Sequence, residues 1–342
     1  MPIYNSGAYL ETAVSCILNQ SLHEIELILV DDGSTDGSSE RCDEYANKDK
    51  RVKVIHQSNK GICHARNTAL KIAIGEYVAF SDHDDEYLPG LLIDNYNIAK
   101  LTNADFVKYL KKEIITSLKG NIRIKAHKMA EPLSLNRIGI KNSFWKLQEN
   151  EILNCVWDGL FKRTFLEEHG IYFDPFYKNG GEDIDFMFKC ISFAQQIKIN
   201  NKYYYNHYIR NGFSTSVKFN EYMLTHIQSF PEKMNNCLEK LDLKADRYTT
   251  EYANFYISNI LGAIVDVLSN PQCNWERNKK IELIVNLRNS QYCYNWIFKV
   301  NTFRIYKKNK KYGILFFLYK HKLYELCLTL YFLRNNTLFC KK

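Results

Sequence analysis

The sequence predicts an α/β fold, in which a mostly parallel sheet is flanked by helices, followed by a helical C-terminal region. Residues 25–30 form an almost continuous apolar run that ends in the turn sequence Asp-Asp-Gly-Ser at 31–34, as expected for a buried strand. Apolar residues recur at helical spacing over 9–18, after a possible cap at Asn5 or Ser6. Strand-like and helix-like segments then alternate, which is typical of a parallel sheet covered by helices.

The remaining elements follow from the same periodicities, taken in chain order. The other predicted strands comprise residues 52–56, 76–80, 104–109, 121–126 and 197–205. The other predicted helices comprise residues 37–47, 61–73, 89–100 and 182–193. After residue 219 the pattern is helical and rich in aromatic residues. We therefore expect an α/β domain over residues 1–218 and a helical, basic region over 219–342.

The charge of the chain is unevenly distributed. The 342 residues carry a formal net charge of +8. Residues 301–342 hold ten Lys and Arg residues against the single acid Glu325, so the rest of the chain is close to neutral. Because a nucleic-acid-binding protein carries its positive charge on the recognition domain, we expect no nucleic acid among the partners.

The cysteines and the apolar runs predict a cytoplasmic protein. The ten cysteines are scattered without a Cys-x-x-Cys pair, which argues against structural zinc and favours a reducing compartment. We recognise no signal peptide. The apolar runs at 313–319 and 328–333 are far shorter than the ~20 residues that a membrane-spanning helix needs.

Two acidic clusters follow directly on predicted strands. Asp31 and Asp32 follow one strand, and residues 82–86, Asp-His-Asp-Asp-Glu, follow another. Both clusters are therefore expected at carboxyl ends of strands, where open α/β sheets bind ligands. Carboxylates this close repel one another unless a cation is present, and Mg²⁺ and Mn²⁺ prefer such oxygen ligands. The alternative is that each cluster is only a solvated turn.

Two further segments place charged groups at predicted helix starts. Glu182 and Asp183 follow two glycines and open a helix, where acids either serve chemistry or only cap the helix dipole. Lys60, His64 and Arg66 lie near the start of an earlier helix, where anions bind well. The sequence contains no Walker loop, nucleophile elbow or zinc-protease helix. These polar residues suit displacement at a phosphorylated donor.

Seven short motifs occur in order between residues 2 and 216. They are Pro2-Ile3-Tyr4-Asn5, Ile17-Leu18-Asn19-Gln20-Ser21, Val30-Asp31-Asp32-Gly33-Ser34-Thr35-Asp36, Asn59-Lys60-Gly61 with Ala65-Arg66-Asn67, Gly75-Glu76-Tyr77, Asp82-His83-Asp84-Asp85 and Glu182-Asp183-Ile184-Asp185-Phe186. In this order and spacing they resemble family 2 of the glycosyltransferases, of the bacterial surface-polysaccharide type. The resemblance implies the Rossmann-like GT-A fold for this part of the chain.

The resemblance also implies which residues bind the nucleotide-sugar donor. Asp32, with Tyr4 and Asp31, matches the part of the family site that holds the nucleobase, usually uracil. Arg66 matches a residue near the phosphates of the donor. Asp82 is expected to face the ribose or the donor sugar.

The metal ligand and the catalytic base are implied in the same way. Asp84, the last acid of the Asp-x-Asp motif, is expected to bind a divalent cation, Mn²⁺ or Mg²⁺. Asp183 falls on the catalytic base of the family. His207 lies where some relatives supply a further metal or phosphate ligand, although a structural histidine on a strand is an equal alternative.

The implied reaction is an inverting transfer from a nucleotide-diphosphate donor, most often a UDP-sugar, to a glycan or lipid-linked acceptor. A hexosyl or N-acetylhexosaminyl group would be moved in surface-polysaccharide synthesis. One base and a metal, without a covalent nucleophile, imply a single displacement. Two alternatives stay open: a truncated inactive paralogue that binds nucleotide without turnover, and a nucleotidyltransferase. The latter would need a Gly-rich basic N-terminal loop, which the sequence lacks.

The two ends of the chain carry one expectation each. Relatives have an apolar strand before Pro-x-Tyr-Asn, whereas Met1 directly precedes Pro2. We expect the reading frame to continue upstream with about six apolar residues, the length of an ordinary strand. At the other end, residues 301–342 mix lysines with apolar side chains, which suits helices lying at an anionic membrane surface. The alternative is that these apolar residues pack on the catalytic domain and leave the lysines in solvent.

Overall fold

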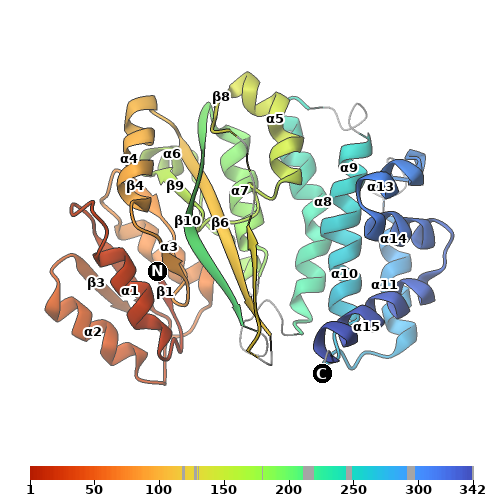
Figure 1. Cartoon of the computed structure of the whole chain (residues 1–342), viewed down its shortest axis with the longest axis horizontal. Coiled ribbons are helices and arrows are strands. Elements are labelled where there is room, and N and C mark those ends of the chain that lie inside the picture. The colour runs from red at the N-terminus through yellow and green to blue at the C-terminus, as the bar shows by residue number, and fades with distance from the viewer. Residues whose placement is uncertain are drawn as a thin grey trace. The chain divides into compact units, whose positions relative to one another are not determined.

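The computed structural model describes residues 1–117, 120–126, 129, 131–178, 180–210, 219–243, 249–290 and 297–340, and only the backbone of 334–340. The chain divides into two compact units, Met1–Asn211 and Gly212–Lys342 (Figure 1). The boundary expected after residue 218 adjoins residues outside the described part, so it stays a prediction.

The first unit begins with a three-stranded parallel sheet. Its strands, in the order β1-β2-β3, are β1 (Pro2–Ile3), β2 (Leu27–Asp31) and β3 (Val52–His56). Every residue of β2 is buried, because this strand is central and its apolar run offers no polar face to water. The expected strand residues upstream of Met1 lie outside the sequence and stay a prediction.

Three helices follow the strands of this sheet in alternation. They are α1 (Tyr9–Leu18), α2 (Ser38–Lys48) and α3 (Ile62–Ile72). The small side chain of Ala65 on α3 lets that helix pack closely on Ile28 and Val30 of β2. This packing fixes α3, and with it Arg66, beside the carboxyl end of β2.

A second, mixed sheet completes the unit in the order β4-β9-β6-β10-β5, with β7 on β6 and β8 on β10. Its strands are β4 (Tyr77–Ala79), β5 (Glu86–Tyr87), β6 (Phe106–Thr116), β7 (Ile122–Ala126), β8 (Leu133–Asn136), β9 (Gly159–Lys162) and β10 (Gln196–Arg210). Only β6 and β10 pair in parallel. The other pairings are antiparallel. One example is β6 with β7, because the connection between these two strands is too short for a parallel crossover.

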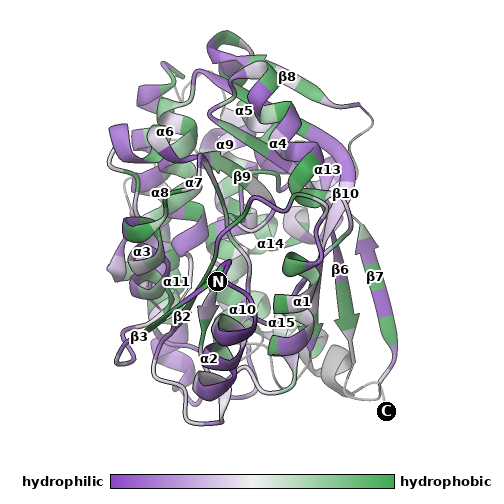
Figure 2. Ribbon diagram, turned by 90° about the vertical axis from the view of Figure 1, so that its left-hand side faces the viewer, coloured by the Kyte–Doolittle hydropathy of each residue, from purple (hydrophilic) through white to green (hydrophobic). Residues whose placement is uncertain are grey.

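Four helices accompany the second sheet: α4 (Leu91–Thr102), α5 (Arg137–Glu149), α6 (Arg163–Glu168) and α7 (Glu182–Phe193). The helix predicted at 182–193 is therefore confirmed with the same bounds. The exposed β7 alternates apolar and polar residues along its length (Figure 2). An apolar cavity of about 370 Å³ lies among β2, α3 and β4 and reaches Met1.

The second unit is helical, as the sequence predicts. Its helices are α8 (Tyr222–Lys240), α9 (Thr249–Phe255), α10 (Gly262–Leu268), α11 (Arg277–Asn289), α13 (Thr302–Lys308), α14 (Lys310–Lys320) and α15 (Tyr324–Cys340). A π-helical turn, η4 (Tyr256–Leu261), joins α9 to α10. Within the described part of the chain, no helix is both long enough and apolar enough to cross a membrane.

The apolar residues of the C-terminal tail divide into two groups. The buried ones include Ile305, Leu315, Phe316, Leu318 and Leu328. Among the described residues, the exposed ones are Phe303, Tyr306, Ile314, Phe317, Leu323, Leu326, Leu330, Phe332 and Leu333. The buried group belongs to the core of the second unit, since α14 and α15 pack on η4, α10 and α11. The tail helices are thus part of a folded unit that also presents apolar side chains to solvent.

Candidate active site

Arg66 of α3 joins two acidic segments that are far apart in the sequence. Its Nη2 donates to Asp82 Oδ1 at 2.8 Å, just beyond β4. Its Nη1 donates to Asp183 Oδ1 at 2.7 Å and to Glu182 Oε1 at 3.1 Å, at the start of α7. Arg66 is only 3% exposed, so the flat guanidinium works as a buried bracket between the two segments.

The charges around this bracket do not balance, because one guanidinium faces three carboxylates. Burial raises the pKa of Glu182, and the neighbouring charge of Asp183 adds to this, so that it reaches about 7. Burial likewise raises the pKa of Asp183, against the opposing effect of Arg66. For Asp82, burial is outweighed by the charge and hydrogen bond of Arg66, and its pKa falls below the ordinary value.

Asp183 is partly exposed and is held by hydrogen bonds from Arg66 and from Val156. Its side chain is 17% exposed, against 11% for Glu182, so it is the more accessible of the two acids that open α7. Its second oxygen, Oδ2, accepts a hydrogen bond from the backbone N–H of Val156 at 3.3 Å. A carboxylate held in place with a raised pKa is well suited to take a proton near neutral pH.

The acidic loop after β4 meets β10, because β5 and β10 pair antiparallel. Asp84 Oδ2 accepts a hydrogen bond from Arg210 Nη1 at 2.9 Å. The next residue, Asp85, is buried and lies 2.9 Å from His207 Nδ1. It also accepts a hydrogen bond from the hydroxyl of Tyr205 at 2.9 Å. The structure therefore places His207 in contact with Asp85, the residue that follows the predicted metal ligand Asp84.

An aromatic stack supports His207 from the other side. The ring of Trp157 lies 4.8 Å from the ring of His207 and 4.5 Å from that of Tyr205, nearly parallel to both. The Nζ of Lys111 lies 4.5 Å from the centre of the Trp157 ring and 3.2 Å from Asp158 Oδ2. Burial lowers the pKa of His207, but the hydrogen bond with Asp85 and the charges of Asp85 and Asp82 together outweigh burial and raise it overall.

The donor set fits a divalent cation bound together with substrate phosphates. Among the described residues there is no group of three or more His, Cys, Asp or Glu side chains that could hold a metal. A Mg²⁺-type site built from one or two carboxylates and the phosphates of the substrate needs fewer protein ligands. Burial, and then the adjacent charge of Asp85, raise the pKa of Asp84, so a cation there would relieve repulsion. His207 contacts Asp85 through Nδ1, so Nε2 is the nitrogen with which it would bind a cation.

The residues expected at the nucleobase lie around the carboxyl ends of β1 and β2. Tyr4 is exposed, and the next residue, Asn5, donates its backbone N–H to Ser34 Oγ at 3.1 Å. Asp31 and Asp32 are both buried. This arrangement links the loops that follow the two strands and leaves the Tyr4 ring beside them.

Both aspartates are occupied by protein donors. Asp31 accepts from the Ser34 N–H at 3.0 Å and lies 3.1 Å from His56 Nδ1. Burial raises its pKa, but these hydrogen bonds outweigh burial and lower it overall. Asp32 accepts from the N–H of Gly61 at 2.8 Å, where the positive φ of +88° suits glycine at the start of α3. The predicted contacts of both aspartates with a nucleobase stay predictions.

Sequence reasoning gave no site role to four residues that the structure places here. Asp85 and Glu182 lie inside the quoted motifs, but local sequence did not show that they contact His207 and Arg66. Trp157 and Arg210 lay outside every motif. A longer predicted strand would have found Arg210, because β10 continues five residues beyond the predicted end at 205.

Known proteins resemble the chain in sequence and in fold. Residues 1–169 match the model of Glycosyl transferase family 2. The uncharacterized glycosyltransferase EpsJ of Bacillus subtilis is 28% identical over 67% of this chain and 65% of its own length. The cholesterol galactosyltransferase of Borreliella burgdorferi is 31% identical over 62% of this chain and 60% of its own length. The chain thus spans less than two thirds of these curated relatives.

A solved glycosyltransferase-type fold matches nearly the whole chain. The crystal structure of S. aureus TarS 1-349 in complex with UDP-GlcNAc superimposes with a TM-score of 0.68 at 21% identity, over 98% of this chain and 89% of that one. At this identity the likeness shows the fold, and it confirms the predicted class with its helical C-terminal region. The family model matches residues 1–169, just under half of the chain, which is the part that carries most of the quoted motifs. The resemblance seen in the sequence is confirmed.

Proposed function

We propose that the protein is an inverting, metal-dependent glycosyltransferase that acts in bacterial surface-polysaccharide synthesis. It would move a hexosyl or N-acetylhexosaminyl group from a nucleotide diphosphate to a glycan or lipid-linked acceptor. The observation that carries the proposal is the Arg66 bracket, which holds the Asp-x-Asp loop and the candidate base Asp183 in one site. Displacement at an anomeric carbon needs a leaving group on one side and a base on the other.

In this mechanism Asp183 accepts the proton of the acceptor hydroxyl as that oxygen attacks the sugar. Arg66 keeps the Asp183 carboxylate oriented through the 2.7 Å hydrogen bond. With no covalent nucleophile, a single displacement inverts the configuration of the sugar carbon. Arg210, which lies beside Asp84, places a fixed positive charge near the acidic loop.

A divalent cation, Mn²⁺ or Mg²⁺, would be held by Asp84, with His207 as a further ligand. When bound, it neutralises the negative charge that builds up on the departing diphosphate. The Asp85 carboxylate orients the imidazole of His207 for this role.

A UDP-sugar is the donor that the comparisons favour. TarS, which shares the fold, has been crystallised with UDP and with UDP-GlcNAc. One sequence relative is named as a galactosyltransferase. The direct experiment is a hydrolysis screen of the purified protein against a panel of sugar nucleotides with Mn²⁺. Tight nucleotide binding without hydrolysis or transfer would instead indicate an inactive paralogue.

Replacing Asp84 by alanine tests the role of the metal. We expect donor turnover to fall by about 10²-fold or more, the usual loss when one group that stabilises a developing charge is removed. The fold should survive, because the Asp84 side chain is partly exposed and forms its ion pair with Arg210, which is itself near the surface. Near-normal turnover by the Asp84→Ala variant in EDTA-treated buffer would contradict metal dependence. Thermal unfolding of both proteins is the control.

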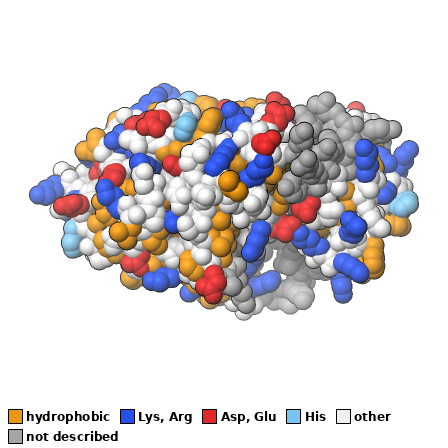
Figure 3. Space-filling model, turned by 90° about the horizontal axis from the view of Figure 1, so that it is seen from above, with side chains coloured by type: hydrophobic (Ala, Val, Ile, Leu, Met, Phe, Trp, Pro, Cys, Tyr) orange, Lys and Arg blue, Asp and Glu red, His pale blue; other side chains and the backbone are white. Residues whose placement is uncertain are grey.

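We also propose that the enzyme works in the cytoplasm, as a peripheral protein on the inner face of the cell membrane. Lysine and arginine side chains lie beside apolar ones on the surface of the C-terminal unit (Figure 3). Each such cation contributes about 1 kcal/mol near an anionic leaflet. Because α14 and α15 pack within the unit, point variants test this placement better than truncation at residue 300.

A further inference from the structure

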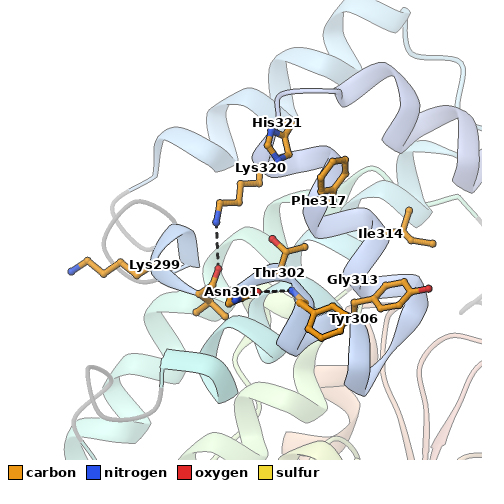
Figure 4. A pocket seen from close by; sticks show the side chains of 11 residues that line it. Lys299, Asn301, Thr302, Tyr306, Gly313, Ile314, Phe317, Lys320 and His321 are labelled. Carbon is orange, nitrogen blue, oxygen red and sulfur yellow. Dashed lines mark hydrogen bonds between the residues drawn. The ribbon is translucent and has the colours of Figure 1, made fainter.

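A groove of about 800 Å³ opens between α13 and α14 of the C-terminal unit (Figure 4). Phe303 and Tyr306 line it from α13, and Ile314 and Phe317 line it from α14. All four side chains are exposed. Within each pair the spacing of three residues puts both side chains on one helix face. Both helices therefore present an apolar face where a helix in water normally carries polar residues.

The opposite end of the groove is cationic. Lys320 and His321 lie at the C-terminal end of α14, away from Ile314, whereas Lys299 lies at the edge of the groove with its side chain extending away from them (Figure 4). Lys320 Nζ makes one long hydrogen bond, 3.4 Å to the carbonyl of Val300. Among the described residues, neither lysine of the groove forms an ion pair with a carboxylate. The lining is thus divided into an apolar end and a cationic end.

The walls of the groove are held by close packing of the two helices. A Cβ added at Gly313 of α14 would lie 2.3 Å from the Cα of Tyr306 on α13, which is closer than atoms can pack. The absence of a side chain at Gly313 therefore allows the backbones to touch below the groove. Backbone contact therefore sets the spacing of the two helices below the groove.

We propose that this groove binds an anionic lipid at a membrane surface. Its acyl chain would lie between the apolar faces of α13 and α14, and its phosphate would lie at Lys320 and His321. Charge complementarity supports this occupant, because residues 297–333 contain eight Lys and Arg against the single acid Glu325. Arg277 already pairs with that acid. The inference rests on the membrane placement proposed above and adds a defined site to it.

Vesicle flotation of the full chain tests the proposal, with phosphatidylcholine vesicles that contain or lack phosphatidylglycerol. We expect binding only to the anionic vesicles. Phe317→Ser should lower the partition coefficient by at least about tenfold, because it removes a buried aromatic contact with lipid. Lys320→Gln should lower it by about fivefold. The matched control is Phe332→Ser on α15: Phe332 is as exposed as Phe317, both at 48%, but lies outside the groove, so we expect little change.

Three results would overturn the proposal. The first is equal loss of binding for Phe317→Ser and Phe332→Ser, and the second is equal recovery on neutral vesicles. The third is a dimer, seen by sedimentation without lipid, that Phe317→Ser abolishes, because a second copy would then occupy the groove. Sugar-nucleotide hydrolysis, measured in parallel, keeps the two proposals separate. A wild-type protein that floats but does not hydrolyse any donor supports the groove and speaks against the proposed enzyme activity.

Discussion

Replacement of Asp183 by asparagine is expected to lower the rate of sugar transfer by about 10²–10⁴-fold, the range for removal of a general base. Asparagine has nearly the same shape, and its oxygen can still accept the hydrogen bond that Arg66 donates to Asp183 at 2.7 Å. Donor affinity should therefore be retained. The loss should lie in kcat, measured with the acceptor saturating, while the dissociation constant for the nucleotide stays unchanged.

Glu182→Gln is the matched control for this variant. Glu182 bonds the same nitrogen of Arg66, at 3.1 Å, but it is less exposed than Asp183. If Asp183 is the base, the Glu182→Gln variant should keep most of its transfer rate, because it removes the charge of Glu182 but leaves the proton acceptor, Asp183, in place. The opposite ranking, with Glu182→Gln the more damaged, would move the catalytic role to Glu182. Equal and small losses of rate for the two variants would indicate that both residues only cap α7.

The pH dependence of transfer provides a further prediction. Burial raises the pKa of Asp183, and a base must be deprotonated to act. The rate should therefore rise with pH along an acidic limb centred above about 4, the ordinary value for aspartate. The residual activity of the Asp183→Asn variant should lack this limb. A limb at the ordinary aspartate value would contradict a desolvated base.

Local sequence patterns were enough to predict the parts of the fold that depend on local periodicity. The strand at 52–56 and the helix at 182–193 are found with the predicted bounds. The mixed second sheet was not predicted, because strand direction depends on pairing between distant segments. The strand predicted at 104–109 is one example. In the structure it is β6, which continues to residue 116 because β7 and β10 pair with its second half from either side.

The same distinction applies to the candidate site. Asp84 and Asp183 were identifiable because each lies in a motif at the end of a strand or the start of a helix. Trp157 was not identifiable, because its contact with His207 joins residues 50 positions apart and has no local signature. The role of Arg66 as a bracket also depends on packing, since its hydrogen bonds to α7 span more than 100 residues.

Of the substitutions considered in the first unit, replacement of Arg66 by methionine should lower the free energy of unfolding most. Methionine fills similar space but leaves three carboxylates of a buried cluster without their counter-charge. Breaking a buried ion pair by removing one partner costs about 3–5 kcal/mol. The expected result is a fall of that size in the free energy of unfolding by urea at pH 7.5, together with loss of transfer activity.

This loss of stability should shrink as the pH falls. The pKa values of Glu182 and Asp183 already lie above their ordinary values, and that of Asp82 lies below it because of Arg66. Without the guanidinium, the folded-state pKa values of all three carboxylates rise. A carboxyl group with a raised pKa stabilises the fold at low pH, and this contribution is lost as the pH rises through its folded-state pKa. The gap between Arg66→Met and wild type should therefore be smaller at pH 5 than at pH 7.5.

Two further variants separate charge from geometry. Arg66→Lys keeps the charge, but one ammonium cannot reproduce the fork that reaches both Asp82 and Asp183, so we expect intermediate stability and low activity. Arg163→Met removes a partly exposed arginine that pairs with Glu167, and such pairs contribute at most about 1 kcal/mol. If Arg66→Met were no more damaging than Arg163→Met, the three carboxylates would not depend on Arg66, and the proposed bracket would have to be abandoned.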